Sequence, residues 1–145
     1  MTSWLLLIYK VPNEPSARRV YVWRKLKGMG AILLQDSAWV LPSTPKTREK
    51  VQWLATEIRD MEGGVVTLWE AQEVFTGQST DLVQQFTAQV DTVYTEILAQ
   101  LEKDEPDLAL LSKQYQQAVS HDYFQSILGQ QVREALMNRR GEPDV

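Results

Sequence analysis

The first 73 residues alternate between short apolar runs and amphipathic stretches, a pattern typical of a protein that mixes strands and helices. Four runs rich in Leu, Ile, Val and Trp are bounded by turn residues, and they predict strands at 4–11, 31–35, 38–41 and 65–69. Two stretches with helical spacing predict helices at 16–28 and 45–62. The predicted order of elements is therefore β-α-β-β-α-β.

Residues at the ends of the two predicted helices are typical of caps. Ser16 is expected to cap the first helix, which stops at the glycines 28 and 30. Thr44 and Pro45 suit the N-cap and the first position of the second helix. The second helix also carries an apolar stripe at positions i, i+3, i+4 and i+7, formed by Val51, Leu54, Ala55, Ile58 and Met61.

Two right-handed βαβ units joined by a hairpin fold most simply as a four-stranded antiparallel sheet with both helices on one face. We therefore predict an α+β, ferredoxin-like domain at residues 1–73. The first strand is apolar at the consecutive positions 5–8, as in a strand that is covered on both faces. The C-terminal helices, or a symmetric partner in a homodimer, are expected to cover the second face.

Residues 80–140 predict a helical extension packed on or beside the sheet. An amphipathic helix is expected at 81–103, followed by a second helix re-capped within 104–107 and a last one near 130–140. Ser120 or Asp122 is expected to cap a helix, with Tyr123 and Phe124 in the core. Ser120-His121-Asp122 resembles a catalytic triad in composition only, because consecutive residues cannot face one another as a catalytic chain.

Composition and charge narrow the range of functions. The chain has 145 residues and no cysteine, which excludes disulfides, thiol nucleophiles and cysteine-based metal centres and suits a cytoplasmic protein. The apolar run at 4–8 is too short for a signal peptide or a membrane span, so no membrane partner is expected. Residues 1–60 have a net charge of +5 and residues 61–145 of −9, which suggests that the two parts attract one another or that only the first part meets an anionic partner.

The stretch from Arg19 to Pro42, with its Arg, Trp and Gly positions, resembles the N-terminal domain of the chromate-resistance regulator ChrB. The opening run at 4–9 and the segment 121–124 are similar too. A looser likeness runs through residues 4–42 to the C-terminal domain of the repressor PaaX and to small CRISPR-associated ferredoxin-like nucleases. The resemblance implies a ferredoxin-like fold and a part in transcriptional regulation. In the nuclease relatives an Asp at the end of the first strand binds a metal; Lys10 stands there in this chain, which argues against metal-dependent cleavage.

One group of cations is the candidate binding site. Lys10 ends the first strand and Arg18 and Arg19 begin the first helix, beside the expected turn at 36–37; Arg24 lies further along that helix. Free amides at a helix N-terminus together with such cations suit an oxyanion or a DNA phosphate. We expect Arg19 on the flank of the apolar stripe and Arg18 nearer to solvent. The alternative is that both arginines are solvated, or pair with acidic neighbours in the turns.

Four tryptophans invite a second interpretation, in which they stack on nucleic-acid bases. Trp23, Trp39 and Trp69 lie in apolar stretches, so packing in the core is the simpler expectation, and Trp53 is expected to be partly exposed. No motif for a cofactor, a metal or a nucleophile is present in the sequence. We therefore expect no enzyme and no cofactor, but a regulatory or sensor module; the alternative is a scaffold that binds another protein through its helical part.

Overall fold

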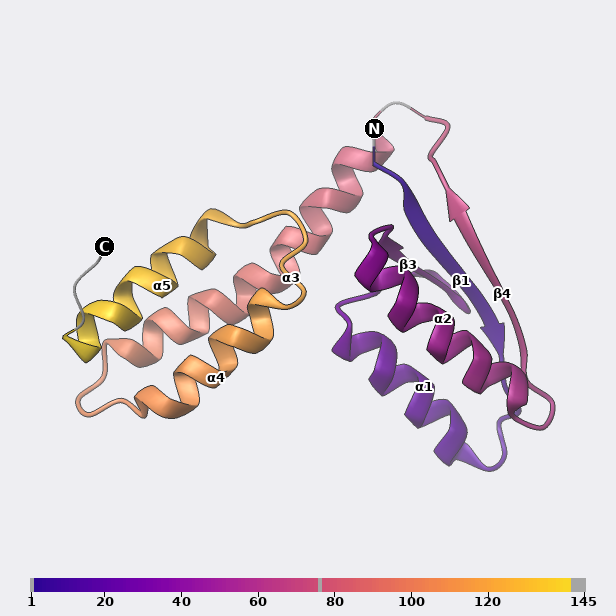
Figure 1. Cartoon of the computed structure of the whole chain (residues 1–145), viewed down its shortest axis with the longest axis horizontal. Helices are drawn as coiled ribbons and strands as arrows, with labels where there is room; N and C mark the ends of the chain where they lie inside the picture. Colours follow the sequence, from indigo (N-terminus) through magenta and orange to yellow (C-terminus); the bar gives the residue numbers. More distant parts are fainter. Residues whose placement is uncertain (1, 76, 142–145) are drawn as a thin grey trace. The chain divides into compact units, whose positions relative to one another are not determined.

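The computed structural model describes residues 2–75 and 77–141. It divides into two compact units, Met1–Ser79 (unit 1) and Thr80–Val145 (unit 2). Unit 1 contains the sheet and two helices, and unit 2 contains three helices (Figure 1).

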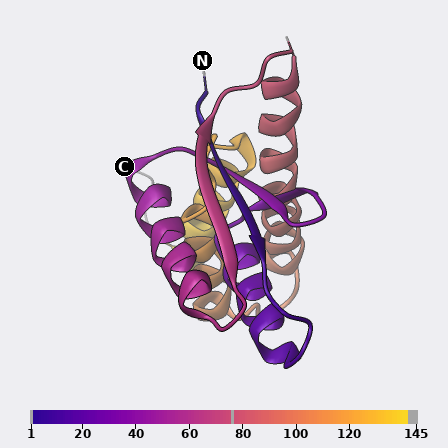
Figure 2. The ribbon, with the colours of Figure 1, turned by 90° about the vertical axis from the view of Figure 1, so that its right-hand side faces the viewer.

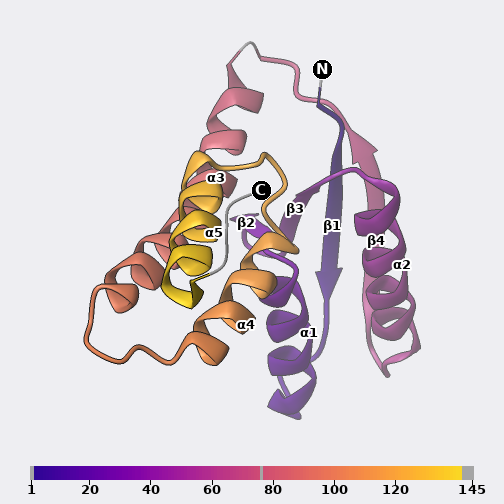
Figure 3. The ribbon, with the colours of Figure 1, turned by 60° about the vertical axis from the view of Figure 1, so that its left-hand side comes forward.

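Unit 1 has the ferredoxin-like α+β architecture that the sequence predicts. Its sheet has the strand order β2-β3-β1-β4 and every neighbouring pair is antiparallel. The strands are β1 (Trp4–Lys10), β2 (Ile32–Gln35), β3 (Ala38–Pro42) and β4 (Val65–Ala71). Strands β1 and β4 run side by side along their whole length (Figure 2). Strand β1 thus lies in the centre of the sheet, flanked by β3 and β4 (Figure 3).

Helices α1 (Ser16–Gly28) and α2 (Pro45–Asp60) lie side by side on one face of this sheet (Figure 1). Both bury the apolar stripe that the sequence predicts: Val22 and Leu26 of α1, and Val51, Leu54 and Ile58 of α2. Thr44 forms a reciprocal capping box with Thr47, and Pro45 occupies the first turn. These contacts fix where α2 begins.

The prediction that Ser16 caps α1 is wrong. The N-cap position belongs to Pro15, which has extended backbone angles and makes no side-chain capping bond. Ser16 is already the first helical residue, so it is not placed to cap the turn that follows. The amides of the first turn of α1 are consequently left without a side-chain cap.

The register of the strands shows which face of the sheet the helices cover. Residues opposite one another in antiparallel strands point to the same face, and Leu5 is opposite Glu70, whose carboxylate contacts Arg48 of α2. The face with Leu5 is therefore the helix-covered one, and its members are among the most buried in the unit: Leu5, Leu7, Trp39 and Leu41. The alternate positions of the strands point to the opposite face, called the open face because Ile8 and Trp69 are exposed on it, although Trp4 and Val40 on the same face are buried.

The prediction that three tryptophans pack in the core is correct for one of them and wrong for the other two. Trp39 is 4% exposed, as expected for the core, and Trp53 is exposed as expected. Trp69, however, is 55% exposed because it points to the open face, and Trp23 on α1 is 52% exposed. The position of each side chain on its element, not the apolar character of its neighbours, decides its burial.

The expectation that another element covers the open face stays a prediction, and a fragment tests it. Ile8, Val65 and Trp69 leave exposed apolar area on this face. A purified 1–79 fragment is therefore expected to self-associate in sedimentation velocity, and Trp69→Lys in that fragment is expected to reduce the association. A 1–79 fragment that folds and remains monomeric would contradict the expectation.

A second prediction concerns the acid stability of unit 1. The hydrogen bond from Arg48 lowers the pKa of Glu70 below its usual value, with a smaller contribution from Ser43. Because the pKa is lowered in the folded state, the stabilisation is present above the unfolded pKa and is lost as pH falls through the lower folded value. Glu70→Gln should flatten the acid side of the stability–pH curve below pH ~4.5. If the acid side of the curve were the same for Glu70→Gln and wild type, the Arg48–Glu70 pair would contribute nothing to stability in acid.

Unit 2 is built from α3 (Gln78–Leu101), α4 (Leu108–Val119) and α5 (Ile127–Arg140). Asp107 caps α4, as expected from the break at 104–107. A shared core joins the three helices through Val90, Tyr94, Ile97, Leu101, Leu111, Ala118, Val132 and Leu136. The helices predicted from the amphipathic pattern are thus present, with α3 and α5 each beginning about three residues earlier than expected.

The segment between α4 and α5 holds a cap for each of the two helices. Ser120 caps the C-terminal end of α4, as expected, and its hydroxyl donates to the carbonyl of Gln117 (2.6 Å), while Ser126 caps the start of α5. Asp122 instead accepts hydrogen bonds from the hydroxyl of the fully buried Tyr94 (2.8 Å) and from the Ser126 amide (3.0 Å). Tyr123 and Phe124 are half-buried against the ring of Phe86. Asp122 is therefore engaged in holding this turn.

Candidate anion-binding site

A pocket of about 530 Å³ opens in unit 1 between α1 and the end of β1. Its lining combines two guanidinium groups, two aromatic rings, a hydroxyl and an aliphatic side chain: Tyr9, Ser16, Arg19, Val20, Trp23 and Arg24. Five of these residues lie on α1 at positions i, i+3, i+4, i+7 and i+8, which is one face of a helix. The pocket is therefore the surface that α1 presents beside its buried stripe of Val22 and Leu26.

Tyr9 comes from the helix-covered side of β1 and closes the pocket from the sheet. Burial raises the pKa of the Tyr9 hydroxyl, while a hydrogen bond from the Trp39 indole and the positive charge of Arg19 lower it to a smaller extent. The Tyr9 amide also donates to the carbonyl of Ser37 (3.3 Å), so the β2–β3 turn lies beside the end of β1, as the sequence predicts. Tyr9 thus links the pocket to the sheet.

Positive charge dominates α1. The helix carries five Lys and Arg residues and no Asp or Glu. Among the described residues, the ion pairs are Arg48–Glu70 and Arg59–Asp60, so neither guanidinium of the pocket is neutralised by a carboxylate. Lys27 adds a further cation, its Nζ lying 5.9 Å from the centre of the Trp23 ring. An anion near this helix would meet the positive charges of these five side chains.

The structure brings two of the four predicted cations together and places the other two outside the pocket. Arg19 and Arg24 line it. Lys10 follows Tyr9 along β1 and therefore points to the opposite face of the sheet. Arg18 donates to the carbonyl oxygen of Glu62 (2.8 Å), beyond the end of α2. The expected exposures are reversed, because this bond draws Arg18 inward to a half-buried position while Arg19 is exposed.

Four pocket residues were not singled out by the charge pattern: Tyr9, Ser16, Val20 and Trp23. The helical spacing of Ser16, Val20 and Trp23 with the two arginines was the available signal. It was obscured because the adjacent positions Val22 and Leu26 form the stronger, buried stripe. Tyr9 carried no such signal, since only the fold brings β1 against α1.

Comparison with known proteins identifies the family of this chain. Residues 19–120 match the family model described as "Protein ChrB, N-terminal", which is more than half of the chain. The chain belongs to the ChrB N-terminal family. The match begins at Arg19, so four of the six pocket residues lie within the family segment, which extends into unit 2.

A curated relative, Protein ChrB of Cupriavidus metallidurans, is 41% identical over 64 residues. That alignment covers 44% of this chain and 20% of the relative, so the chain matches one fifth of the length of this ChrB protein. The resemblance stated from the sequence is confirmed at the level of the N-terminal domain.

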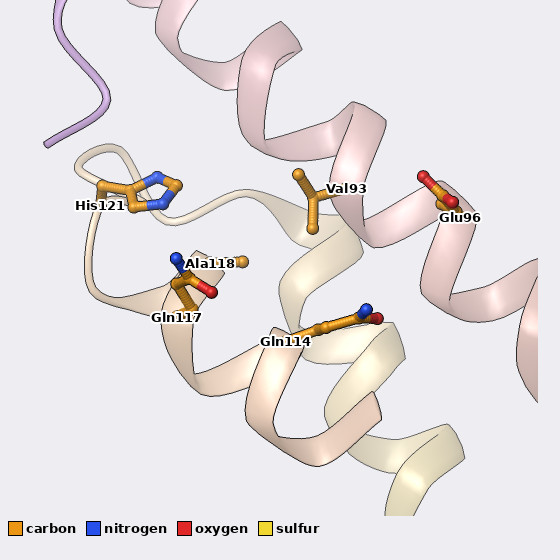
Figure 4. A pocket seen from close by; sticks show the side chains of 6 residues that line it. All are labelled: Val93, Glu96, Gln114, Gln117, Ala118 and His121. Atoms are coloured by element: carbon orange, nitrogen blue, oxygen red, sulfur yellow. The ribbon is translucent and has the colours of Figure 1, made fainter. Parts of the chain in front are cut away.

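This ChrB-family chain has a second pocket, of about 280 Å³, within unit 2 (Figure 4). Val93 and Glu96 extend into it from α3, while Gln114, Gln117 and Ala118 extend from α4 and His121 from the turn that follows (Figure 4). The lining combines two amide side chains, an imidazole and a carboxylate with the aliphatic side chains of Val93 and Ala118. It contains no arginine or lysine that could hold an anion.

Residues 2–75 and 77–141 contain no cluster of three or more His, Asp or Glu side chains that could hold a metal ion. Within the same ranges, no helix combines the length and apolar character that crossing a membrane requires.

Proposed function

We propose that this ChrB-family chain is a non-enzymatic regulatory or sensor module of chromate resistance, acting in the cytoplasm and binding a tetrahedral oxyanion group at the α1 pocket. The observation that carries the proposal is that Arg19 and Arg24 line one pocket with no carboxylate paired to either. Free chromate, sulfate or phosphate and a DNA phosphate share this chemistry.

Three features of the pocket favour an anion. A guanidinium group presents a planar fork of donors that matches two oxygens of an oxyanion. Ser16 adds a hydroxyl at the start of α1, where the amides of the first turn have no side-chain cap. The N-terminal end of a helix also carries partial positive charge. Each feature is one that favours a negatively charged oxygen.

A thermal-shift series tests the proposal. Unit 1 contains all five tryptophans of the chain, so tryptophan fluorescence follows the unfolding of the unit that carries the pocket. Chromate, sulfate, phosphate and a short DNA duplex are compared at equal ionic strength, because a ligand of the native state raises the midpoint by mass action. We expect at least one to raise it.

The two sources of the oxyanion group differ in their dependence on salt. The binding constant for DNA should fall as the salt concentration rises, with a slope of roughly one per neutralised phosphate on logarithmic axes. Binding of a free oxyanion should weaken only as far as the anion of the added salt competes for the pocket. The DNA arm therefore distinguishes a sensor of free anions from a DNA-binding surface. If no anion raises the midpoint, the proposal fails.

A second candidate function rests on unit 2. This unit has its own core and a net charge of −6 over residues 80–145, and its pocket is lined by amide side chains and Glu96. Such a surface suits a protein partner better than an anion. A pull-down that recovers one protein and no DNA, and that fails with Glu96→Arg, would favour this scaffold function.

A further inference from the structure

The α1 pocket is larger than a bare oxyanion requires. This open pocket has a volume of about 530 Å³, within the range of pockets that hold drug-sized ligands. A water molecule occupies about 30 Å³ of liquid, and a tetrahedral oxyanion needs only a few times that volume. Two guanidinium groups and a hydroxyl account for one part of the lining, and Tyr9, Val20 and Trp23 are available to a further part of a ligand.

That remainder is aromatic and aliphatic. Trp23 is 52% exposed and Val20 is 43% exposed, although both lie in the pocket, and Tyr9 is half-buried beside them. Trp23 lies one turn beyond Arg19 and immediately before Arg24. A large indole surface that the fold leaves open next to two guanidinium groups is available to a planar ring.

We infer that the pocket binds a nucleotide, with its base stacked on Trp23 and its phosphate held by Arg19 and Arg24. The inference rests on the proposed function and specifies its ligand: the oxyanion group carries an aromatic ring. Stacking on an indole tolerates every base, since each has a π-face, so the pocket should discriminate weakly among nucleobases. The nucleotide is either free or an unpaired residue of a single strand.

Paired bases do not fit this arrangement. In a duplex both faces of a base are stacked on their neighbours, so a base reaches an indole only after it is unpaired and extruded, which costs a few kcal/mol. A mononucleotide and a single strand should therefore bind more tightly than a duplex of the same length. Lys27, close to the Trp23 ring, adds charge for a neighbouring phosphate.

Binding titrations followed by tryptophan fluorescence test the inference. The probes are adenosine 5′-monophosphate, adenosine, inorganic phosphate, an oligodeoxythymidylate and a duplex of equal length. The variants are Trp23→Leu and, as a matched control, Trp53→Leu, which removes a tryptophan that is 66% exposed on α2 outside the pocket. Isothermal titration calorimetry repeats the measurement without relying on fluorescence, and circular dichroism confirms that each variant is folded.

The expected result is that adenosine monophosphate binds at least about tenfold more tightly than phosphate, and that Trp23→Leu removes this advantage. Phosphate binding should be unchanged in the Trp53→Leu control. Tighter binding of the oligonucleotide than of the mononucleotide would identify a single strand as the source, and the reverse would identify a free nucleotide.

Other outcomes separate the inference from the function on which it rests. If adenosine monophosphate binds no more tightly than phosphate, or if the two leucine variants behave alike, the nucleotide inference is overturned and the anion site stands. Binding of the duplex alone overturns it in the same way. If none of the phosphate-bearing probes binds, the inference fails, and the proposed site fails with it when chromate and sulfate do not bind either.

Discussion

Replacement of Gly64 by alanine is expected to destabilise unit 1 by about 3 kcal/mol or more. A Cβ at this position would lie 2.0 Å from the carbonyl oxygen of Ile58 and 3.1 Å from that of Met61. Both atoms belong to the backbone at the end of α2, and the Ile58 side chain is fully buried, so no flexible side chain can move aside. Either α2 or the start of β4 must shift.

Gly28→Ala is the matched control for this prediction. A Cβ at Gly28 meets nothing within 4 Å, and the residue lies in the last turn of α1 without a positive φ. Alanine there should stabilise the unit by about 0.4–1 kcal/mol, because it restricts the unfolded chain. Urea unfolding followed by tryptophan fluorescence measures both variants in unit 1 alone. If Gly64→Ala lowered the free energy of unfolding by less than about 1 kcal/mol, the close contact of Gly64 with the backbone at the end of α2 would be contradicted.

The second large effect is expected at the pocket. Removing Arg19 or Arg24 by alanine should weaken anion binding at least about tenfold each, because hydrogen bonds to charged groups contribute about 1.5–3 kcal/mol. Both side chains are exposed, so the fold should survive the change. Arg59→Ala is the control, since this arginine is also exposed but lies outside the pocket.

Conservative variants separate charge from geometry. Arg19→Lys keeps the positive charge but loses the planar fork of donors, so the anion should bind several-fold more weakly than to wild type. Arg18→Ala should leave binding unchanged, because its guanidinium is bonded to the Glu62 carbonyl oxygen. If Arg18→Ala and Arg19→Lys weaken binding equally, the contact is general electrostatic attraction to α1 rather than recognition in the pocket.

Much of the fold was predictable because local signals agreed with the global arrangement. Thr44 and Pro45 mark the start of α2, Asp107 marks the start of α4, and the apolar stripe of α2 is the one that is buried. The predictions failed where the sequence pattern of a segment does not show to which side of the segment a side chain points. Trp69 lies in an apolar strand, yet the register of β4 points it to the open face.

The candidate site was only partly predictable for the same reason. Charge alone suggested a cluster of Lys10, Arg18 and Arg19, but alternation along β1 turns Lys10 away and the Glu62 carbonyl engages Arg18. Arg24 lies with Arg19 because the two share a helix face. Tyr9 joins them only through the packing of α1 on β1, which no local sequence pattern encodes.

Direct titration of an anion into wild type and into the Arg19→Ala/Arg24→Ala double variant tests whether these two arginines hold the anion in the α1 pocket. The anion is the member of the chromate, sulfate, phosphate and DNA series that raises the unfolding midpoint most, and binding is measured by calorimetry at two salt concentrations. We predict saturable binding to wild type and to Arg59→Ala, and a loss of roughly a hundredfold or more in the double variant. Equal binding by wild type and the double variant would contradict the account, because the anion would then bind elsewhere.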